Sequence, residues 1–307
     1  MKRVAVLGTG IMGGHMARRL AAAGFDVVGW NRSPAKVAAL AAAGVSAAAR
    51  VEDALTGADA VVVMLSTGPV VDEVLFRHGS TGTAPGASAL ELLAPGTPLI
   101  VMSSIPVETA RAQARSAAAH GLRYLDAPVS GGEPGARDGT LAILVGGAAA
   151  AFAAAAPLFA ALGRATLLGP AGSGQLAKLA NQVIVGGTLV AIAEALTLVR
   201  QGGADPAAVR EALLGGFGDS KVLRVLGERM VSGNFEPGSP AAYQLKDLRT
   251  ASALASGFGL HLPLLDQLID TFSSLAAQGD GERDVSVVLR EVERQAARQP
   301  LRTELPR

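Results

Sequence analysis

The sequence has no cysteine and almost no net charge. The absence of cysteine from its 307 residues excludes disulfide bonds, thiolate catalysis and cysteine-ligated zinc. Lysine and arginine number 27 against 26 aspartates and glutamates, so the formal net charge is +1. A chain without a basic field has little electrostatic attraction to nucleic acid or to an anionic membrane. We therefore expect neither as a partner.

Metal-ligand spacing, a signal peptide and a full-length membrane span are also missing. The longest apolar run, 183–199, contains Glu194 and is shorter than the roughly 20 residues that a transmembrane helix needs. We expect a buried helix there, and a soluble, cytoplasmic protein without a metal site. The four histidines are scattered along the chain at His15, His78, His120 and His261.

Half of the residues are apolar, and much of that half is alanine, which favours tightly packed helices. Strand and helix patterns alternate over about the first 165 residues, as in an α/β fold with a mostly parallel sheet covered on both faces. Only helical patterns follow. We predict a sheet domain at 1–168, an all-α domain at 169–297 that begins with a long helix, and a tail at 298–307.

The second half of the sequence divides into six predicted helices. Gly186 and Gly187 lie inside the first of them, where each glycine costs about 1 kcal/mol unless the helix needs the space. We interpret the pair as a close approach to a neighbouring helix. The predicted helices span residues 174–201, 206–214, 220–231, 241–257, 262–277 and 283–297.

The segment GTGIMG follows the first predicted strand and opens the first predicted helix. In this context Gly8 permits a tight turn, Gly10 lets the backbone approach a pyrophosphate, and Gly13 lets helix and strand pack closely. The helix N-terminus adds N–H donors. We predict a dinucleotide site that includes Ile11 and Met12.

The second predicted strand ends at Asn31, Arg32 and Ser33. An NAD site usually carries an acidic residue there, whereas a guanidinium can bind the 2′-phosphate of NADP. Arg32 could also be an ordinary surface arginine. We predict that NADP(H) is preferred over NAD(H).

Four further segments carry polar groups suited to a small acid. Ser130, Gly131 and Gly132 follow a strand and can hold a carboxylate, although a plain glycine turn fits equally well. Ser103 and Ser104 end another strand, at the edge where such sheets bind ligands. Two more groups lie on helices, where a solvated face is the ordinary alternative: Lys178 with Asn181 and Gln182, and Lys246 with Asp247.

The order of these segments resembles the β-hydroxyacid dehydrogenase family. That family includes 3-hydroxyisobutyrate dehydrogenase, tartronate semialdehyde reductase and glyoxylate/succinic semialdehyde reductase. The resemblance covers residues 2–295 and implies a Rossmann domain, a long interdomain helix, an all-α second domain and a homodimer or homotetramer. The matching segments are GTGIMG at 8–13, NRSPAK at 31–36, ML at 64–65, DAPVSGG at 126–132, GQLAKLANQ at 174–182 and KDL at 246–248.

The resemblance also implies roles for individual residues. Lys178 matches the catalytic lysine, and Asn181 matches its neighbouring amide. Ser104 and Lys246 match positions that contact the cofactor, as do Met64 and Leu65. The positions implied for substrate binding are Ser130, Gly131, Gly132, Gln182, Ser239 and Asp247.

Three positions depart from the family pattern. Val101 stands where many members have aspartate, and Gln182 replaces a frequent second asparagine. Ser239 stands where several glyoxylate-type and tartronate-type members carry phenylalanine, so the pocket should be wider or wetter.

We expect an oxidoreductase that moves a hydride between NADPH and a small aldehyde or keto acid, or the reverse with a β-hydroxyacid. Lys178 would serve as general acid and base. Two alternatives stay open. The first is an imine reductase, although such relatives usually replace this lysine. The second is a non-catalytic NADPH-binding scaffold.

Overall fold

The computed structural model describes residues 1–76 and 88–298. The chain forms two compact units, Met1–Lys178 and Leu179–Arg307. The division falls inside a helix, ten residues beyond the predicted boundary at 168, because the start of that helix is hydrogen-bonded within the first unit. The predicted tail at 298–307 lies outside the described residues from 299 onward.

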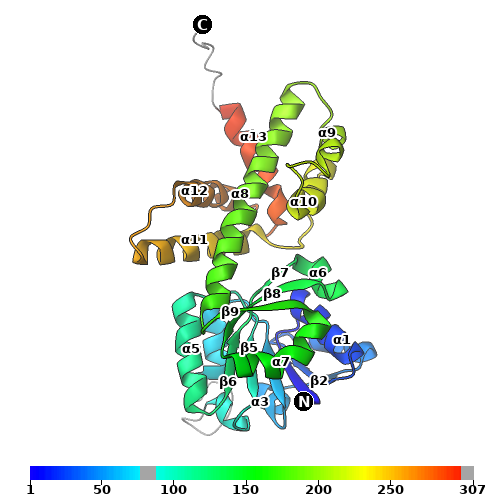
Figure 1. The fold of residues 1–307 in the computed structure, drawn as a ribbon. Helices are drawn as coiled ribbons and strands as arrows, with labels where there is room; N and C mark the ends of the chain where they lie inside the picture. The colour runs from blue at the N-terminus through cyan, green and yellow to red at the C-terminus, as the bar shows by residue number, and fades with distance from the viewer. Residues whose placement is uncertain (77–87, 299–307) are drawn as a thin grey trace. The chain divides into compact units, whose positions relative to one another are not determined.

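The first unit is built on one sheet of nine strands among the described residues (Figure 1). Its order, β3-β2-β1-β4-β5-β6-β8-β7, begins with the strand order of a Rossmann fold. Pairs from β3 through β6 are parallel, β8 is antiparallel to β6 and β7, and β9 joins β8 in parallel. The strands are β1 Arg3–Leu7, β2 Asp26–Trp30, β3 Val45–Ala47, β4 Ala60–Val63, β5 Pro98–Val101, β6 Arg123–Asp126, β7 Val129–Ser130, β8 Leu141–Gly147 and β9 Gly163–Gly169.

Helices cover both faces of this sheet, as the sequence predicts. Successive side chains of a strand point to opposite faces, so each central strand serves two cores. Val4 and Val6 of β1 pack in a core with Met16 and Leu20 of α1, whereas Leu7 packs in the other core. Helices α6 and α7 contribute to the first core, and α3, α4 and α5 to the second. The helices of this unit are α1 Ile11–Ala22, α2 Pro34–Ala38, α3 Val51–Leu55, α4 Gly68–Val71, α5 Val107–Ala119, α6 Gly132–Asp138 and α7 Ala149–Leu162.

Some short or alanine-rich elements were not predicted. β3, β7, α3 and α6 are two to seven residues long, too short for a clear periodic pattern. Helix α7 is mostly alanine, so its apolar face does not stand out. Helix α4 is followed directly by a π-helical turn, Asp72–Phe76. Within residues 1–76 and 88–298, short 3₁₀ segments lie at Ala41–Ala43, Ala89–Leu92 and Val285–Val287.

The second unit is helical over its described residues, with one isolated β-bridge between Pro240 and Asp284. The six predicted helices are confirmed, with bounds that differ by a few residues at most, apart from the last, which begins later. They are α8 Ser173–Gln201, which starts in the first unit, α9 Pro206–Leu213, α10 Lys221–Ser232, α11 Ala241–Gly257, α12 Pro263–Ala277 and α13 Val288–Arg298.

The interpretation of Gly186 as a close-approach position is confirmed. A Cβ on Gly186 would lie 2.9 Å from Nε2 of Gln244 on α11 and 3.3 Å from a methyl of Leu268 on α12. Side chains of both neighbouring helices therefore occupy the space that this glycine leaves open. Gly187 is less crowded, with a methyl of Leu264 at 3.4 Å from the same Cβ position.

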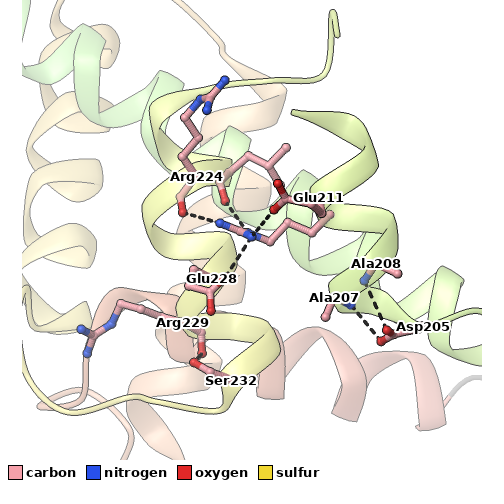
Figure 2. A network of polar contacts seen from close by, with 10 residues as sticks. Asp205, Ala207, Ala208, Glu211, Arg224, Glu228, Arg229 and Ser232 are labelled. Carbon is pink, nitrogen blue, oxygen red and sulfur yellow. Dashed lines mark hydrogen bonds and ion pairs between the residues drawn. The ribbon is translucent and has the colours of Figure 1, made fainter. Parts of the chain in front are cut away.

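A buried guanidinium joins α9 to α10. Arg210 donates to the carbonyl oxygens of Leu223, at 3.2 Å, and Arg224, at 2.7 Å. It also pairs with Glu228 at 2.9 Å and Glu211 at 3.5 Å. Figure 2 shows this network, with Glu211, Arg224 and Glu228 labelled. The planar fork of arginine suits several fixed acceptors at once, so the network holds the two helices in register.

Among the described residues, α8 alone is long and apolar enough to cross a membrane. It carries Glu194, and 33% of its most apolar window is buried inside the structure. Leu189 and Ala193 are fully buried in the second unit, whereas Ile184 and Leu198 are 69% and 75% exposed. The helix thus contributes to a protein core and also presents apolar side chains to the exterior.

Candidate active site

The glycine turn after β1 is held by its own packing. Gly8 has a φ of +94°, which favours glycine, and a Cβ there would overlap the carbonyl oxygen of Met64. A Cβ on Gly13 would overlap the carbonyl oxygen of Gly8. The Gly8 N–H donates to the carbonyl oxygen of Trp30 at 2.8 Å. These two glycines let α1 begin directly against the ends of β1 and β4.

Gly10 needs a different explanation. A Cβ at this position would meet nothing within 4 Å, and its φ of −71° is open to other residues. The protein's own packing therefore does not require glycine here. Gly10 is the N-cap of α1, whose first turn has no capping side chain and no acidic residue. Uncovered backbone N–H groups beside open space fit the approach of a pyrophosphate.

Asn31 links the glycine turn to the loop after β2. Its Oδ1 accepts the N–H of Thr9 at 3.2 Å, and its Nδ2 donates to the carbonyl oxygen of Ser33 at 3.2 Å. Arg32 and Ser33 are exposed. One hydrogen bond, from Thr9 to Asn31, thus joins the glycine turn to the loop after β2, and Arg32 in that loop is exposed to solvent.

The ends of β4 and β5 are joined in the same way. Leu65 N–H donates to Ser103 Oγ at 2.9 Å. The residues that follow β4 and those that follow β5 therefore lie at the same edge of the sheet. Ser104 is half-buried. Val101, one of the departures from the family pattern, lies fully buried in the second core of the sheet domain. Its side chain is therefore part of the packing that supports the sheet edge.

Asp126 and Gln175 anchor the start of α8 to this edge. Asp126 is fully buried, and its carboxylate accepts the N–H groups of Gly172 at 2.7 Å and Gln175 at 2.9 Å. Burial raises the pKa of the Asp126 carboxyl, and these N–H donors oppose that rise. Gln175 is also fully buried, donates to the carbonyl oxygen of Ser103 and accepts the N–H of Ile105. The helix that carries Lys178 therefore begins at a fixed place on the sheet.

The predicted carboxylate loop follows the short strand β7. Ser130 pairs with Ala142 of β8, which fixes the backbone of the loop at its first residue. Gly131 and Gly132 have φ values of +133° and +61°, conformations that favour glycine. Ser130 is half-buried. A hydroxyl and successive backbone N–H groups are thus held at the end of a strand.

Lys178 is the last residue of the first unit, and it is half-buried in α8. Asn181 and Gln182 follow it in the same helix as the first polar residues of the second unit. Asn181 is half-buried and Gln182 is buried.

In the second unit, Gln182 joins α8 to α11. Its Nε2 donates to Oδ2 of Asp247 at 2.9 Å, and its Oε1 accepts from Nδ2 of Asn181 at 3.0 Å. Oδ1 of Asp247 pairs with Nζ of Lys246 at 3.1 Å. Four of the predicted site residues therefore form one connected network, and Asp247 is part of the buried interior of the unit.

Ser239 lies apart from this network in the hydrogen bonds that the structure records. Its side chain is exposed, and its backbone N–H donates to Oδ2 of Asp284 at 3.0 Å. A cavity of about 350 Å³ at the corner between α11 and α12 has Ser252, His261 and Asp266 in its lining. None of the predicted site residues lines that cavity.

Three residues that hold predicted site residues in place were not themselves predicted: Asp126, Gln175 and Gln244. Asp126 opens the DAPVSGG segment, and an acid at the end of a buried strand is a signal that could have identified it. The two glutamines carry no such signal in a single sequence. Over residues 1–76 and 88–298, no group of three histidines, aspartates or glutamates could hold a metal ion, and His78 lies outside these ranges.

Comparison with known proteins agrees with this arrangement. Residues 3–173 match the family described as the NAD binding domain of 6-phosphogluconate dehydrogenase. Residues 172–292 match the family described as NAD-binding of NADP-dependent 3-hydroxyisobutyrate dehydrogenase. Together the two matches span almost the whole chain.

Individual relatives extend over nearly the full length. The 2-hydroxy-3-oxopropionate reductase of Escherichia coli (strain K12) is 41% identical over 295 residues, covering 95% of this chain and 97% of that protein. The NAD-dependent L-serine dehydrogenase of Pseudomonas aeruginosa is 34% identical, covering 94% and 97%. A solved structure of Mycobacterium tuberculosis 3-hydroxyisobutyrate dehydrogenase with L-serine is 31% identical, with a TM-score of 0.82 over 97% of this chain and 100% of that one.

The glycine turn, the fold and these full-length matches agree with one another. The resemblance inferred from the ordered motifs is therefore confirmed. The chain belongs to the β-hydroxyacid dehydrogenase family and is an oxidoreductase with an NAD(P)-binding domain.

Proposed function

We propose that this enzyme transfers a hydride between NADPH and a small aldehyde or keto acid. The candidate substrates are glyoxylate, succinic semialdehyde and tartronate semialdehyde. In the reverse direction it would oxidise a β-hydroxyacid such as 3-hydroxyisobutyrate or 3-hydroxypropionate. The observation that carries the proposal is the presence of Lys178 and Asn181 on α8 in a chain that is 41% identical to a 2-hydroxy-3-oxopropionate reductase.

When bound, reduced nicotinamide supplies the hydride that reaches the carbonyl carbon. The residues of the chain stabilise the charge that develops on the substrate oxygen and transfer the proton. As the C=O bond becomes a C–O single bond, negative charge grows on the oxygen, and the Lys178 ammonium stabilises it and donates the proton from Nζ. In the oxidation direction the neutral amine accepts the alcohol proton. Asn181 orients the lysine or the substrate oxygen without adding a competing charge.

The carboxylate of the substrate is assigned to the loop after β7. The Ser130 hydroxyl and the backbone N–H groups of Gly131 and Gly132 are suited to a carboxylate, because together they offer several donors from a rigid backbone. Gln182, Asp247 and Ser239 remain predicted to line the substrate side. The exposed serine at 239 supports a pocket wider than one closed by an aromatic ring.

The coenzyme assignment includes a preference for NADP(H). No acidic side chain stands at positions 31 to 33 to repel a 2′-phosphate, and Arg32 is exposed and able to bind one. Gly8, Gly10, Ile11, Met12 and Gly13 would hold the pyrophosphate. Met64, Leu65, Ser104 and Lys246 would contact the rest of the coenzyme. The NAD-dependent L-serine dehydrogenase among the relatives makes the preference worth measuring directly.

Replacing Arg32 by alanine should weaken the use of NADPH selectively. A lost charge-assisted pair with the 2′-phosphate costs about 1.5–3 kcal/mol, so kcat/KM for NADPH should fall by about tenfold or more. The value for NADH should stay within about twofold, since NADH has no 2′-phosphate. Arg18→Ala, at an exposed arginine on α1, serves as the control and should change neither value. A wild-type preference for NADH, or an equal loss with both coenzymes, would remove the assignment.

A substrate panel tests the reaction itself. The aldehyde acids are supplied with NADPH and the β-hydroxyacids with NADP⁺, and coenzyme absorbance is followed. Succinic semialdehyde should react at least about tenfold more efficiently than butanal, which has the same chain without the carboxylate, because the loop at Ser130 binds the acid. Equal rates would argue against that loop. Turnover of a cyclic imine alone would favour an imine reductase, and no turnover with any compound would favour a scaffold.

The proposal also includes self-association of the chain and its location in the cell. Four large apolar side chains lie exposed within seven residues at the corner between α11 and α12: Phe258, Leu260, Leu262 and Leu264. Exposed apolar residues gathered in this way support an interface with a second copy, as in a homodimer or homotetramer. Cytoplasmic location stays a prediction from the sequence.

A further inference from the structure

The orientation of the Gln182 amide is fixed by its partners in the second unit. Asp247 presents a carboxylate oxygen, which accepts hydrogen bonds, at 2.9 Å from the Gln182 nitrogen. The second hydrogen of the same nitrogen goes to Oε1 of Gln244, also at 2.9 Å. With both hydrogens used, the Gln182 oxygen must face Asn181 and accept its Nδ2 hydrogen at 3.0 Å.

Gln244 is itself fixed by the backbone. Its nitrogen donates to the carbonyl oxygen of Gln182 at 2.9 Å, and a backbone carbonyl can only accept. This bond turns the Gln244 oxygen toward the Gln182 side chain. Gln244 is 5% exposed, and Gly186 leaves the space for its amide, because a Cβ there would lie 2.9 Å from Nε2. The two glutamines are therefore locked as a reciprocal pair.

The same network reaches Lys246. Oδ2 of Asp247 accepts from Gln182, while Oδ1 pairs with the Lys246 ammonium at 3.1 Å. One carboxylate thus connects an amide four residues after the proposed acid–base lysine with a lysine assigned to the coenzyme. Gln244 itself lies in the buried interior and is assigned no contact with substrate or coenzyme.

We propose that Gln244 is a positioning residue for the reaction: it sets the Gln182 amide, which in turn turns the Asn181 amide toward its working orientation. The inference rests on the proposed function, since it takes Asn181 as part of the catalytic group. A small error in the placement of a reacting or orienting group is enough to lower turnover strongly. Gln244 therefore controls kcat through Asn181, at a distance from the chemistry.

A purely structural role would look different. If Gln244 only packed α8 against α11, its loss would lower stability and would reduce activity by the same factor in any background. If it acts through Asn181, its loss matters only while Asn181 is present. A double-mutant cycle on kcat separates the two cases, because coupled residues give non-additive effects.

The experiment compares Gln244→Met, Asn181→Ala and the double variant in the full-length protein. Methionine keeps the length of the side chain and removes both hydrogen bonds. Thr271→Val is the matched control: Thr271 is 2% exposed on α12 and loses a bond to the Gln267 carbonyl oxygen, outside the network. Lys178→Met is measured in parallel as the test of the proposed function.

We expect Gln244→Met to lower kcat by about tenfold or more with KM for NADPH changed less than about threefold, since orientation is lost and coenzyme contacts are kept. The double variant should match Asn181→Ala within about twofold. Thr271→Val, which removes one buried hydrogen bond outside the network, should leave kcat unchanged.

Two outcomes would overturn the inference: wild-type kcat in Gln244→Met, or a double variant whose loss is the product of the two single losses. Neither outcome depends on whether Lys178 is the general acid and base. Normal turnover in Lys178→Met would instead contradict the proposed function, and it would do so whatever the cycle shows.

Discussion

Replacement of Lys178 by methionine is expected to lower kcat by about 100-fold or more, the scale of lost general acid–base catalysis. Methionine has a similar length and carries no proton that it can donate. The charge that grows on the substrate oxygen would then have no ammonium beside it. NADPH affinity should stay within about threefold of wild type, because the residues assigned to the coenzyme are unchanged. Steady-state kinetics and calorimetric titration with NADPH measure the two quantities.

Chemical rescue makes this prediction specific. Lys178→Ala leaves space for a small primary amine, so ethylamine added to the assay should restore part of the lost activity. Triethylamine, which is bulkier, should restore less. A variant that turns over at the wild-type rate would contradict the role of Lys178. Loss of activity together with loss of NADPH binding or of folding would show that the lysine supports the structure, and the amine arm would then give no rescue.

Gly13 and Gly10 of the turn should respond to alanine in two different ways. Gly13→Ala should destabilise the fold by about 4 kcal/mol or more, the range seen when a buried clash has no room to relax. The new methyl would overlap the carbonyl oxygen of Gly8. Gly10→Ala should leave stability within about 0.5 kcal/mol, the range of surface substitutions, because nothing lies within 4 Å of its Cβ position.

Among the variants that fold, Gly10→Ala should weaken coenzyme binding most, although it changes stability least. Gly10→Ala puts a methyl where the pyrophosphate is expected to approach the backbone, so the Kd for NADPH should rise by about tenfold or more, which is about 1.4 kcal/mol. Urea titration gives the stability and calorimetry gives the Kd. Gly24→Ala, at a positive-φ glycine with open space after α1, is a control for backbone effects and should leave the Kd unchanged. A Gly10→Ala protein that binds NADPH as tightly as wild type would place the pyrophosphate elsewhere.

Regular, long elements were predictable from the sequence, whereas contacts between distant residues were not. The helix bounds in the second half are close to those predicted because apolar periodicity and terminal glycine or proline signals are local. β9 was not predicted, because glycines and an arginine obscure the alternation of apolar and polar residues along it. Its position is instead set by pairing with β8. Local pattern does not carry such pairing information.

The candidate site shows the same difference between local motifs and contacts that join distant residues. The glycine turn and the polar groups at strand ends were visible as motifs, because their spacing is fixed by one strand and one helix. The pair Gln182–Gln244 spans 62 residues, and the pair Gln175–Ser103 spans 72. Neither partner has a spacing that reveals the other. The sequence therefore identified which groups were available for chemistry, and the three-dimensional arrangement identified what holds them.

The hydrogen bond from Gly8 to the Trp30 carbonyl has a practical consequence. Trp30 is the single tryptophan of the chain, and this bond ties its backbone to the glycine turn. Indole emission overlaps the absorption of reduced nicotinamide, so energy transfer from this one fluorophore can report coenzyme binding in unlabelled protein. The chain thus carries its own optical probe next to the turn, with no second indole to blur the signal.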